Sequence, residues 1–334
     1  MSGNDVLPNP RPFERYATFT AADLMRAEFP PMQWAVPDLV PEGFSILAAS
    51  PKIGKSFMVL HLALECVSGG HAFGVIPVDP RPVVYLALED GQRGLRDRIK
   101  RIGAHVSEDA LEHIDFKTEI HPQKPARLVI REFLDKYKAD APLVVLDTLG
   151  KARPPKIGSR MSYDDDLRET GGYADLTHEY PGSSLIAVHH TNKGQHEDPF
   201  DGVSGTQGIV GGADTVLRLS RRRNSGGVTM HVTGRELEEH HYAFNFAQNL
   251  WRLDGSDLEE ASRLAGVQND ADRLSENSRK ILDMLVKFPD GLPTADVVRM
   301  SGMPRSEVDV ILSRQVQAGR LLRPRRGLYA VVQK

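Results

Sequence analysis

The sequence predicts an α/β protein with a mostly parallel sheet, followed by a small C-terminal winged-helix domain. Over residues 44–253, short β-rich runs alternate with longer amphipathic patterns. The runs are apolar nearly throughout, as expected of strands that helices cover on both faces. Residues 276–334 then carry three helical patterns and two short β-like runs, which is the order of elements in a winged helix.

Four segments are expected along the 334 residues. Residues 1–40 contain several prolines and few periodic apolar positions, so we interpret them as an N-terminal arm that packs on a neighbour or on its own core. Residues 41–254 form the α/β domain. The polar, acidic stretch 255–275 is interpreted as a linker or short exposed helix, and residues 276–334 as the winged-helix domain.

Composition excludes several classes of protein. A net charge of −3 excludes a polycation that coats nucleic acid nonspecifically, so any such contact must come from local patches. No apolar run is long enough to span a bilayer, and residues 1–16 lack the pattern of a secretion signal. The single cysteine, Cys66, cannot form an internal disulfide. We therefore expect a cytoplasmic protein with no membrane partner.

Residues 49–56 have the pattern of a phosphate-binding loop, or P-loop, between a strand and a helix. Lys55 is expected to neutralise the β and γ phosphates of ATP, and Ser56 to ligate Mg²⁺. Ala49 replaces the first glycine of the pattern, which predicts altered loop detail rather than lost binding. The expected nucleotide contacts are Ser50, Pro51, Lys52, Ile53, Gly54, Lys55, Ser56 and Phe57.

Carboxylates follow two of the predicted strands. Asp147 comes after an apolar run, as the Walker B motif requires, and is expected to organise Mg²⁺ together with Ser56. Glu89 and Asp90 end another run, at the edge of the sheet where ligands of this fold bind. Because Glu89 follows its run directly, it is the preferred candidate for orienting the attacking water.

A third strand ends in His189 and His190. Neighbouring side chains on a strand point to opposite faces, so only one imidazole easily reaches a γ-phosphate. No further histidine or cysteine lies at ligand spacing, and this disfavours a metal site. A sensor of the γ-phosphate is the simpler role.

In this order, the motifs resemble those of the RecA-like ATPases, and among them the RepA-like hexameric helicases of plasmids and phages. The resemblance covers roughly residues 30–253 and includes the glycine-rich stretch 198–221. It implies that Lys55 contacts phosphate, that Ser56 ligates magnesium and that Asp147 lies behind the metal. It also implies that Glu89 polarises the attacking water and that His190 transmits the state of the nucleotide to the DNA-binding loops.

The resemblance also implies a homo-oligomer, most simply a hexamer, with ATP between subunits and an arginine from the neighbour completing the site. Such an arginine supplies positive charge only when the interface closes. The candidates are Arg218 and Arg235. Arg235 is favoured, because it follows a β-like run and precedes an acidic patch that would orient it.

Two basic patches are candidates for DNA contact. The loop after Asp147 carries Lys151, Arg153, Lys156 and Arg160, a density suited to the backbone of single-stranded DNA in a central channel. The wing of the C-terminal domain presents Arg323, Arg325 and Arg326, which suit duplex phosphates. Acids on the presumed reading helix, Glu307 and Asp309, weaken base recognition, and a protein-docking role for this domain stays open.

The leading hypothesis is therefore a DNA-stimulated ATPase of the replicative-helicase type. A nucleotide-switched DNA-binding or regulatory protein is the main alternative, and a recombinase that forms filaments is a third. A ring and a filament use the same head-to-tail interface, so the residues alone do not separate them.

Overall fold

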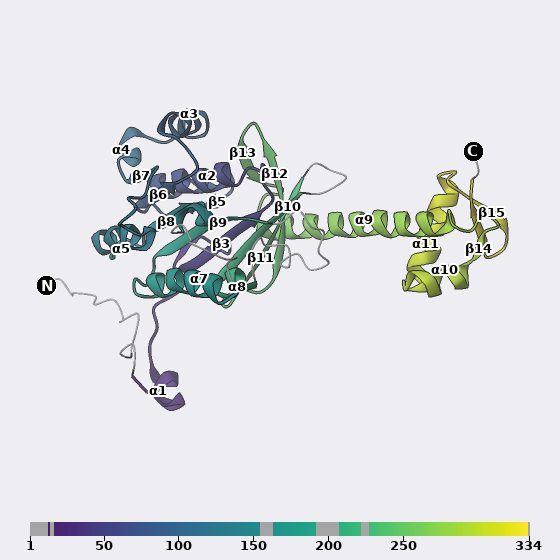
Figure 1. Ribbon diagram of the computed structural model, residues 1–334, viewed down its shortest axis with the longest axis horizontal. Helices are drawn as coiled ribbons and strands as arrows, with labels where there is room; N and C mark the ends of the chain where they lie inside the picture. The colour runs from purple at the N-terminus through teal and green to yellow at the C-terminus, as the bar shows by residue number, and fades with distance from the viewer. Residues whose placement is uncertain (1–12, 14–16, 154–162, 192–206, 222–226, 333–334) are drawn as a thin grey trace. The chain divides into compact units, whose positions relative to one another are not determined.

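The computed structural model describes residues 13, 17–153, 163–191, 207–221 and 227–332. The chain divides into two compact units, and the boundary after the first falls between Ser262 and Arg263. The first unit has the α/β core and the second has the winged-helix fold, so both parts of the predicted fold class are confirmed (Figure 1).

The core of the first unit is a mixed sheet. Among the described residues its strand order is β13-β12-β11-β10-β3-β9-β8-β6-β7. The segment from β10 to β7 is parallel throughout, and β11, β12 and β13 add to it as antiparallel strands. The strands are β3 (Gly43–Ala49), β6 (Val83–Ala87), β7 (Ile114–Lys117), β8 (Leu143–Asp147), β9 (Ser184–His190), β10 (Thr215–Arg221), β11 (Val228–Gly234), β12 (His240–Ala247) and β13 (Leu250–Leu253).

Helices cover both faces of this sheet (Figure 1). One apolar cluster lies on the side of α2, and a second lies on the side of α5 and α7. This two-sided burial explains why the parallel strands are apolar nearly throughout. The helices of this unit are α2 (Lys55–Ser68), α3 (Gln92–Ile102), α4 (Glu108–Leu111), α5 (Ala126–Tyr137), α6 (Leu149–Ala152), α7 (Tyr163–His178) and α8 (Gln207–Gly211).

The segment before β3 is only partly an arm. Helix α1 (Ala21–Arg26) has no buried residue, whereas the pair β1 (Trp34–Val36) and β2 (Val40–Pro41) contributes Ala35, Val36 and Val40 to the core. The core therefore begins before residue 41, where the sequence placed the domain boundary. A second small hairpin, β4 (His71–Ala72) with β5 (Ile76–Pro77), follows α2.

The stretch expected to be a linker or a short exposed helix belongs to a long helix. Helix α9 (Leu258–Leu285) begins three residues into the stretch 255–275 and continues into the first predicted helix of the second unit. Ala261 and Ala265 are fully buried. Because they are four residues apart, they lie on the same face of the helix. Small alanines make this buried face, so the sequence is polar overall although the helix is amphipathic.

The second unit is a small winged helix. Its described elements after α9 are β14 (Leu292–Pro293), α10 (Thr294–Ser301), α11 (Arg305–Gln317), β15 (Leu321–Arg325) and β16 (Leu328–Val331), with strand order β14-β16-β15. A separate apolar cluster built on residues such as Ile281, Val297 and Ile311 holds them together. Among the described residues of both units, no helix has the length and apolarity needed to cross a bilayer.

Candidate functional site

A pocket of about 280 Å³ lies where β3, β6, β8 and β9 end, at the C-terminal edge of the parallel strands. Of the residues that the sequence selected, Lys52, Gly54, Lys55, Ser56, Phe57, Glu89, Asp147 and His190 line this pocket, which is called the P-loop pocket below. Ser50 and Pro51 are exposed beside it, and the side chain of Ile53 is buried in the core instead. The strand ends thus bring together residues that lie far apart in the chain.

The P-loop joins β3 to α2. Ala49 is the last residue of β3 and keeps extended backbone, paired in register with His190 of β9, so a side chain is tolerated at the first glycine position. Gly54 is different. It caps α2 with φ of 108°, and an added Cβ would come within 2.9 Å of the Phe246 ring. Glycine is therefore required here both by backbone conformation and by space.

Lys55 begins α2 and is buried, with its ammonium turned back onto the loop. Its Nζ donates to the carbonyl oxygens of Ala49 at 2.8 Å and Ser50 at 3.0 Å, and it lies 3.1 Å from Nδ1 of His190. Burial lowers the pKa of Lys55 to about 8, although the charges of Asp147 and Glu89 oppose this shift. A cation held at this cost has a strong electrostatic preference for an anionic ligand.

Asp147 ends β8 and is almost completely buried. The hydroxyl of Tyr85 donates to its Oδ2 at 2.9 Å, and Ser56 also hydrogen-bonds the carboxylate. Burial raises the pKa of Asp147, and the two hydrogen bonds act against that shift. Within the described residues, Oδ1 has no hydrogen-bond partner. A buried carboxylate oxygen without a donor, beside a serine hydroxyl, fits a hydrated Mg²⁺ ion.

Glu89 stands opposite, one residue beyond the end of the apolar run of β6. The Thr148 hydroxyl donates to its Oε1 at 2.9 Å, and Nε2 of His190 lies 3.6 Å from the same oxygen. Asp90, the neighbouring candidate, instead forms an ion pair with Arg98. The structure therefore orients Glu89 toward the pocket, with Thr148 and His190 as its supports.

Sequence reasoning missed the wall formed by the hairpin of β12 and β13. Phe246 and Asn249 line the pocket, and Phe246 stacks on Trp251 with 4.8 Å between ring centroids. The indole of Trp251 donates to the carbonyl oxygen of Gly54 at 3.0 Å. The turn residues Gln248 and Asn249 both have positive φ, typical of a two-residue hairpin. The alternating aromatics of "HYAFNFAQNLW" were the available signal.

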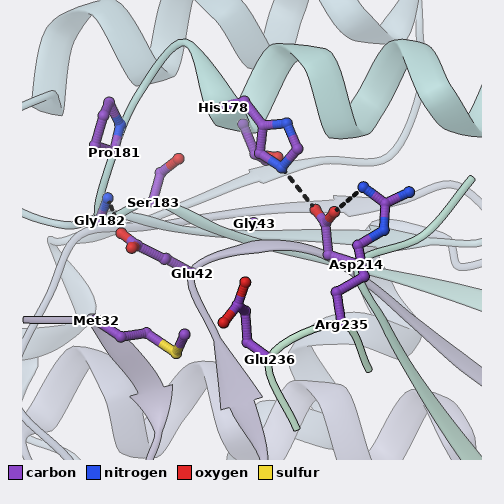
Figure 2. Close-up of a pocket in the computed structure, with 11 residues that line it drawn as sticks. Met32, Glu42, Gly43, His178, Pro181, Gly182, Ser183, Asp214, Arg235 and Glu236 are labelled. Atoms are coloured by element: carbon purple, nitrogen blue, oxygen red, sulfur yellow. Dashed lines mark hydrogen bonds and ion pairs between the residues drawn. The ribbon is translucent and has the colours of Figure 1, made fainter. Parts of the chain in front are cut away.

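The two arginine candidates do not line the P-loop pocket of their own chain. Arg235 follows β11 and lies 3.4 Å from Asp214, at the opposite edge of the sheet, beside a separate pocket (Figure 2). Arg218 lies within β10, opposite His231 of β11 and Ala48 of β3. Either side chain would have to act on a neighbouring copy.

The candidate DNA contacts divide into three groups. Lys151 on α6 is exposed, and Arg323, Arg325 and Arg326 are exposed on the wing. Arg153 differs from the expectation, because its guanidinium pairs with buried Asp166 at 2.9 Å and only 15% of the side chain is exposed. Lys156 and Arg160 lie outside the described residues.

Two families of known proteins match the chain. The family described as AAA domain matches residues 9–196, which is more than half of the chain and includes the P-loop, Glu89, Asp147 and His190. The family described as transcriptional regulator, AbiEi antitoxin, matches residues 294–332, which run from α10 through β16 of the winged-helix unit.

Proposed function

The chain belongs to the AAA domain family of P-loop ATPases, and from this premise we propose that it is a DNA-stimulated ATPase acting as a RepA-like hexameric helicase. In this proposal it moves along single-stranded DNA during plasmid or phage replication. The observation that carries it is the convergence of Lys55, Asp147, Glu89 and His190 on one pocket. In this proposal Lys55 neutralises phosphate, Asp147 places the metal ion and Glu89 orients the attacking water. His190 connects the pocket to the loop that follows β9.

In this proposal each side chain of the pocket has a role that its contacts support. On ATP binding, Lys55 exchanges the carbonyls of Ala49 and Ser50 for phosphate oxygens, because an anion satisfies a buried ammonium better than neutral acceptors do. Ser56 and Asp147 would hold Mg²⁺, which neutralises charge on the β and γ phosphates. Glu89, held by Thr148, orients the attacking water and accepts its proton.

His190 couples this chemistry to the rest of the chain. Its ring lies between Lys55 and Glu89, so a triphosphate that draws Lys55 away changes the environment of both histidine nitrogens. An arginine from the next subunit, Arg235 or Arg218, completes the charge stabilisation of the transferred phosphoryl group. The ring of Phe246 offers a face for the adenine base, and the Asn249 amide offers hydrogen bonds to its edge.

The winged-helix unit supports duplex contact more strongly than its sequence does. Glu307 of α11 accepts a hydrogen bond from Asn277 of α9 at 2.6 Å, so its charge is engaged within the unit. Asp309 lies 3.8 Å from Arg305 on the same helix and is partly neutralised there. The wing arginines remain exposed, which suits phosphate contacts beside a helix in the major groove.

The test is ATP hydrolysis and strand separation by the purified full chain, with single-stranded DNA, random duplex or no DNA. The proposal predicts hydrolysis that rises with single-stranded DNA and separation of a forked duplex. One hydrolysis rate under all three conditions, without strand separation, would falsify it.

A second candidate function is a nucleotide-switched DNA-binding regulator. The observation that favours it is the match of residues 294–332 to the transcriptional regulator family. This function predicts a strong preference for one duplex sequence and little translocation. A selection of bound fragments from a random duplex library separates the two: an enriched motif supports the regulator, whereas length-dependent binding without a motif supports the helicase.

A further inference from the structure

Helix α3 presents a basic face that its own unit leaves uncovered. Leu95 and Ile102 are buried on one side of the helix, and the other side exposes Arg93, Arg96, Lys100 and Arg101. At helical spacing Arg93, Arg96 and Lys100 fall on one row, and Arg101 flanks it on the exposed side of the helix. These four cations are called the basic stripe below. Asp97 is the acid within it and pairs with Arg96 at 2.9 Å. The stripe therefore keeps a net positive charge.

The pocket at the opposite edge of the sheet has the complementary character. It has a volume of about 490 Å³, with Met32 and Pro181 as apolar walls and Glu42 and Glu236 as acids (Figure 2). Glu42 accepts a hydrogen bond from the Gly182 amide, and burial raises the pKa of its carboxyl. In the described chain neither Glu42 nor Glu236 forms an ion pair. The hydrogen bond from Gly182 and the charge of nearby His178 offset only part of the desolvation cost of half-buried Glu42.

The third acid of this pocket is already neutralised. Asp214 accepts from the Phe44 amide at 3.0 Å and from His178 at 3.0 Å, and Arg235 lies beside it. Arg235 and His178 are therefore directed at Asp214 rather than at Glu42 (Figure 2). The acidity of the pocket continues along the turn between β11 and β12, where Glu238 and Glu239 are exposed. We call Glu42, Glu236, Glu238 and Glu239 the acidic socket.

The basic stripe and the acidic socket lie on different parts of the first unit. Helix α3 follows the C-terminal end of β6, whereas the socket lies where β3, β9 and β10 begin. No residue of α3 lines the pocket of the socket, so one chain does not bring the two surfaces together. A contact between them has to join two copies head to tail, which is the arrangement that closes into rings or extends into filaments.

We propose that the basic stripe of one copy docks into the acidic socket of a second copy. A lysine or arginine that enters beside Glu42 supplies the missing countercharge, and its aliphatic stem packs on Met32 and Pro181. Arg98 of the same helix lines the P-loop pocket, so the contact places a neighbour next to the site of hydrolysis. The inference rests on the oligomeric part of the proposed function.

Charge reversal tests this contact in the full-length protein. The stripe variant carries Arg96→Glu, Lys100→Glu and Arg101→Glu, and the socket variant carries Glu236→Lys, Glu238→Lys and Glu239→Lys. The matched control, Lys124→Glu, Lys136→Glu and Lys138→Glu, reverses the same charge on α5 and just outside its two ends. Sedimentation velocity gives the assembled fraction with a non-hydrolysable ATP analogue, at low and high salt. Equilibrium binding of the analogue is measured in parallel.

Each reversal is expected to weaken assembly about tenfold to a hundredfold, since several like charges then face each other across the contact. The control should assemble as the wild type does, and a chain carrying both reversals should recover assembly. Retained binding of the analogue shows that the P-loop pocket is intact, so failure of this contact is distinguished from failure of the proposed function. Unchanged assembly in the stripe variant would overturn the contact, and a simultaneous loss of DNA binding would assign the stripe to nucleic acid.

Discussion

The P-loop pocket and the larger pocket at the opposite edge of the sheet differ in how completely their charged side chains are paired within the chain. In the P-loop pocket, Oδ1 of Asp147 has no donor among the described residues, and the Lys55 ammonium is held by neutral acceptors. In the larger pocket at the opposite edge, Asp214 is saturated by Phe44, His178 and Arg235. Size and charge alone would select the larger pocket. The smaller pocket is selected for chemistry because it sets a buried carboxylate oxygen, which has no donor within the described chain, beside a buried ammonium.

The largest expected effect that tests this comparison is at Lys55. Lys55→Ala removes the cation that faces the phosphates, so we expect ATP turnover to fall by about 10²–10³-fold. Turnover is measured by release of phosphate at saturating single-stranded DNA. Lys138→Ala, an exposed lysine after α5, is the control and should retain full activity. Turnover that survives in Lys55→Ala would remove the P-loop pocket from the mechanism.

The next effect concerns Tyr85, whose hydroxyl orients Asp147. Tyr85→Phe deletes one hydrogen bond to a charged acceptor, worth roughly 1.5–3 kcal/mol, so we expect turnover to fall by about tenfold or more. The Mg²⁺ concentration for half-maximal rate should rise as well, because the carboxylate that places the ion is freer. Tyr137→Phe, on α5, serves as the control. A purely structural role would lower thermal stability without moving the Mg²⁺ dependence.

The pKa of Lys55 predicts a pH dependence. Without nucleotide its pKa is about 8, and phosphate oxygens stabilise the charged form, so the pKa is higher in the complex. Above pH 8, binding therefore requires uptake of a proton. Affinity for ATP should decline as pH rises from 8, by up to about tenfold per pH unit. Calorimetry in buffers of different ionisation enthalpy counts the protons, and no uptake at pH 9 would contradict the assignment.

The smallest effect on catalysis is expected from the opposite pocket. Asp214→Asn weakens contacts that join β3, α7 and the end of β11, so we expect the free energy of unfolding to fall by about 1–3 kcal/mol. Binding of ATP by the single chain should stay within about twofold of the wild type. Denaturant unfolding and equilibrium binding give the two quantities. If a folded Asp214→Asn protein no longer bound nucleotide, the claim that only the P-loop pocket binds ATP would be contradicted.

Local patterns in the sequence were sufficient to predict the residues at strand ends. Glu89, Asp147 and His190 each follow or end an apolar run, and parallel strands bring such positions to one edge. Lys55 begins the helix that follows the P-loop at the same edge. Hydrogen-bond partners that meet only in the tertiary structure could not be predicted from such local patterns. Trp251 meets Gly54 across 197 residues of chain. The apolar run of β6 also does not reveal that the Tyr85 hydroxyl faces Asp147.

The arginines that differ from the prediction do so because their acidic partners come from other elements of the fold. Arg153 lies in a basic stretch, and the sequence therefore predicts a DNA contact for it. In the structure its guanidinium instead pairs with Asp166 of α7, thirteen residues later. Arg235 precedes an acidic patch, but its partner is Asp214, at the start of β10. A charged side chain can be placed on an element from sequence, whereas the countercharge it meets depends on which elements pack beside it.

The most direct measurement is the comparison of ATP binding with ATP turnover in Glu89→Gln. Glutamine keeps the size of the side chain and its hydrogen bond from Thr148, but it cannot accept a proton from water. The account predicts affinity within about twofold of the wild type and turnover lowered by about 10²-fold or more, with single-stranded DNA present. Turnover equal to the wild type, or affinity lost in a folded protein, would contradict it.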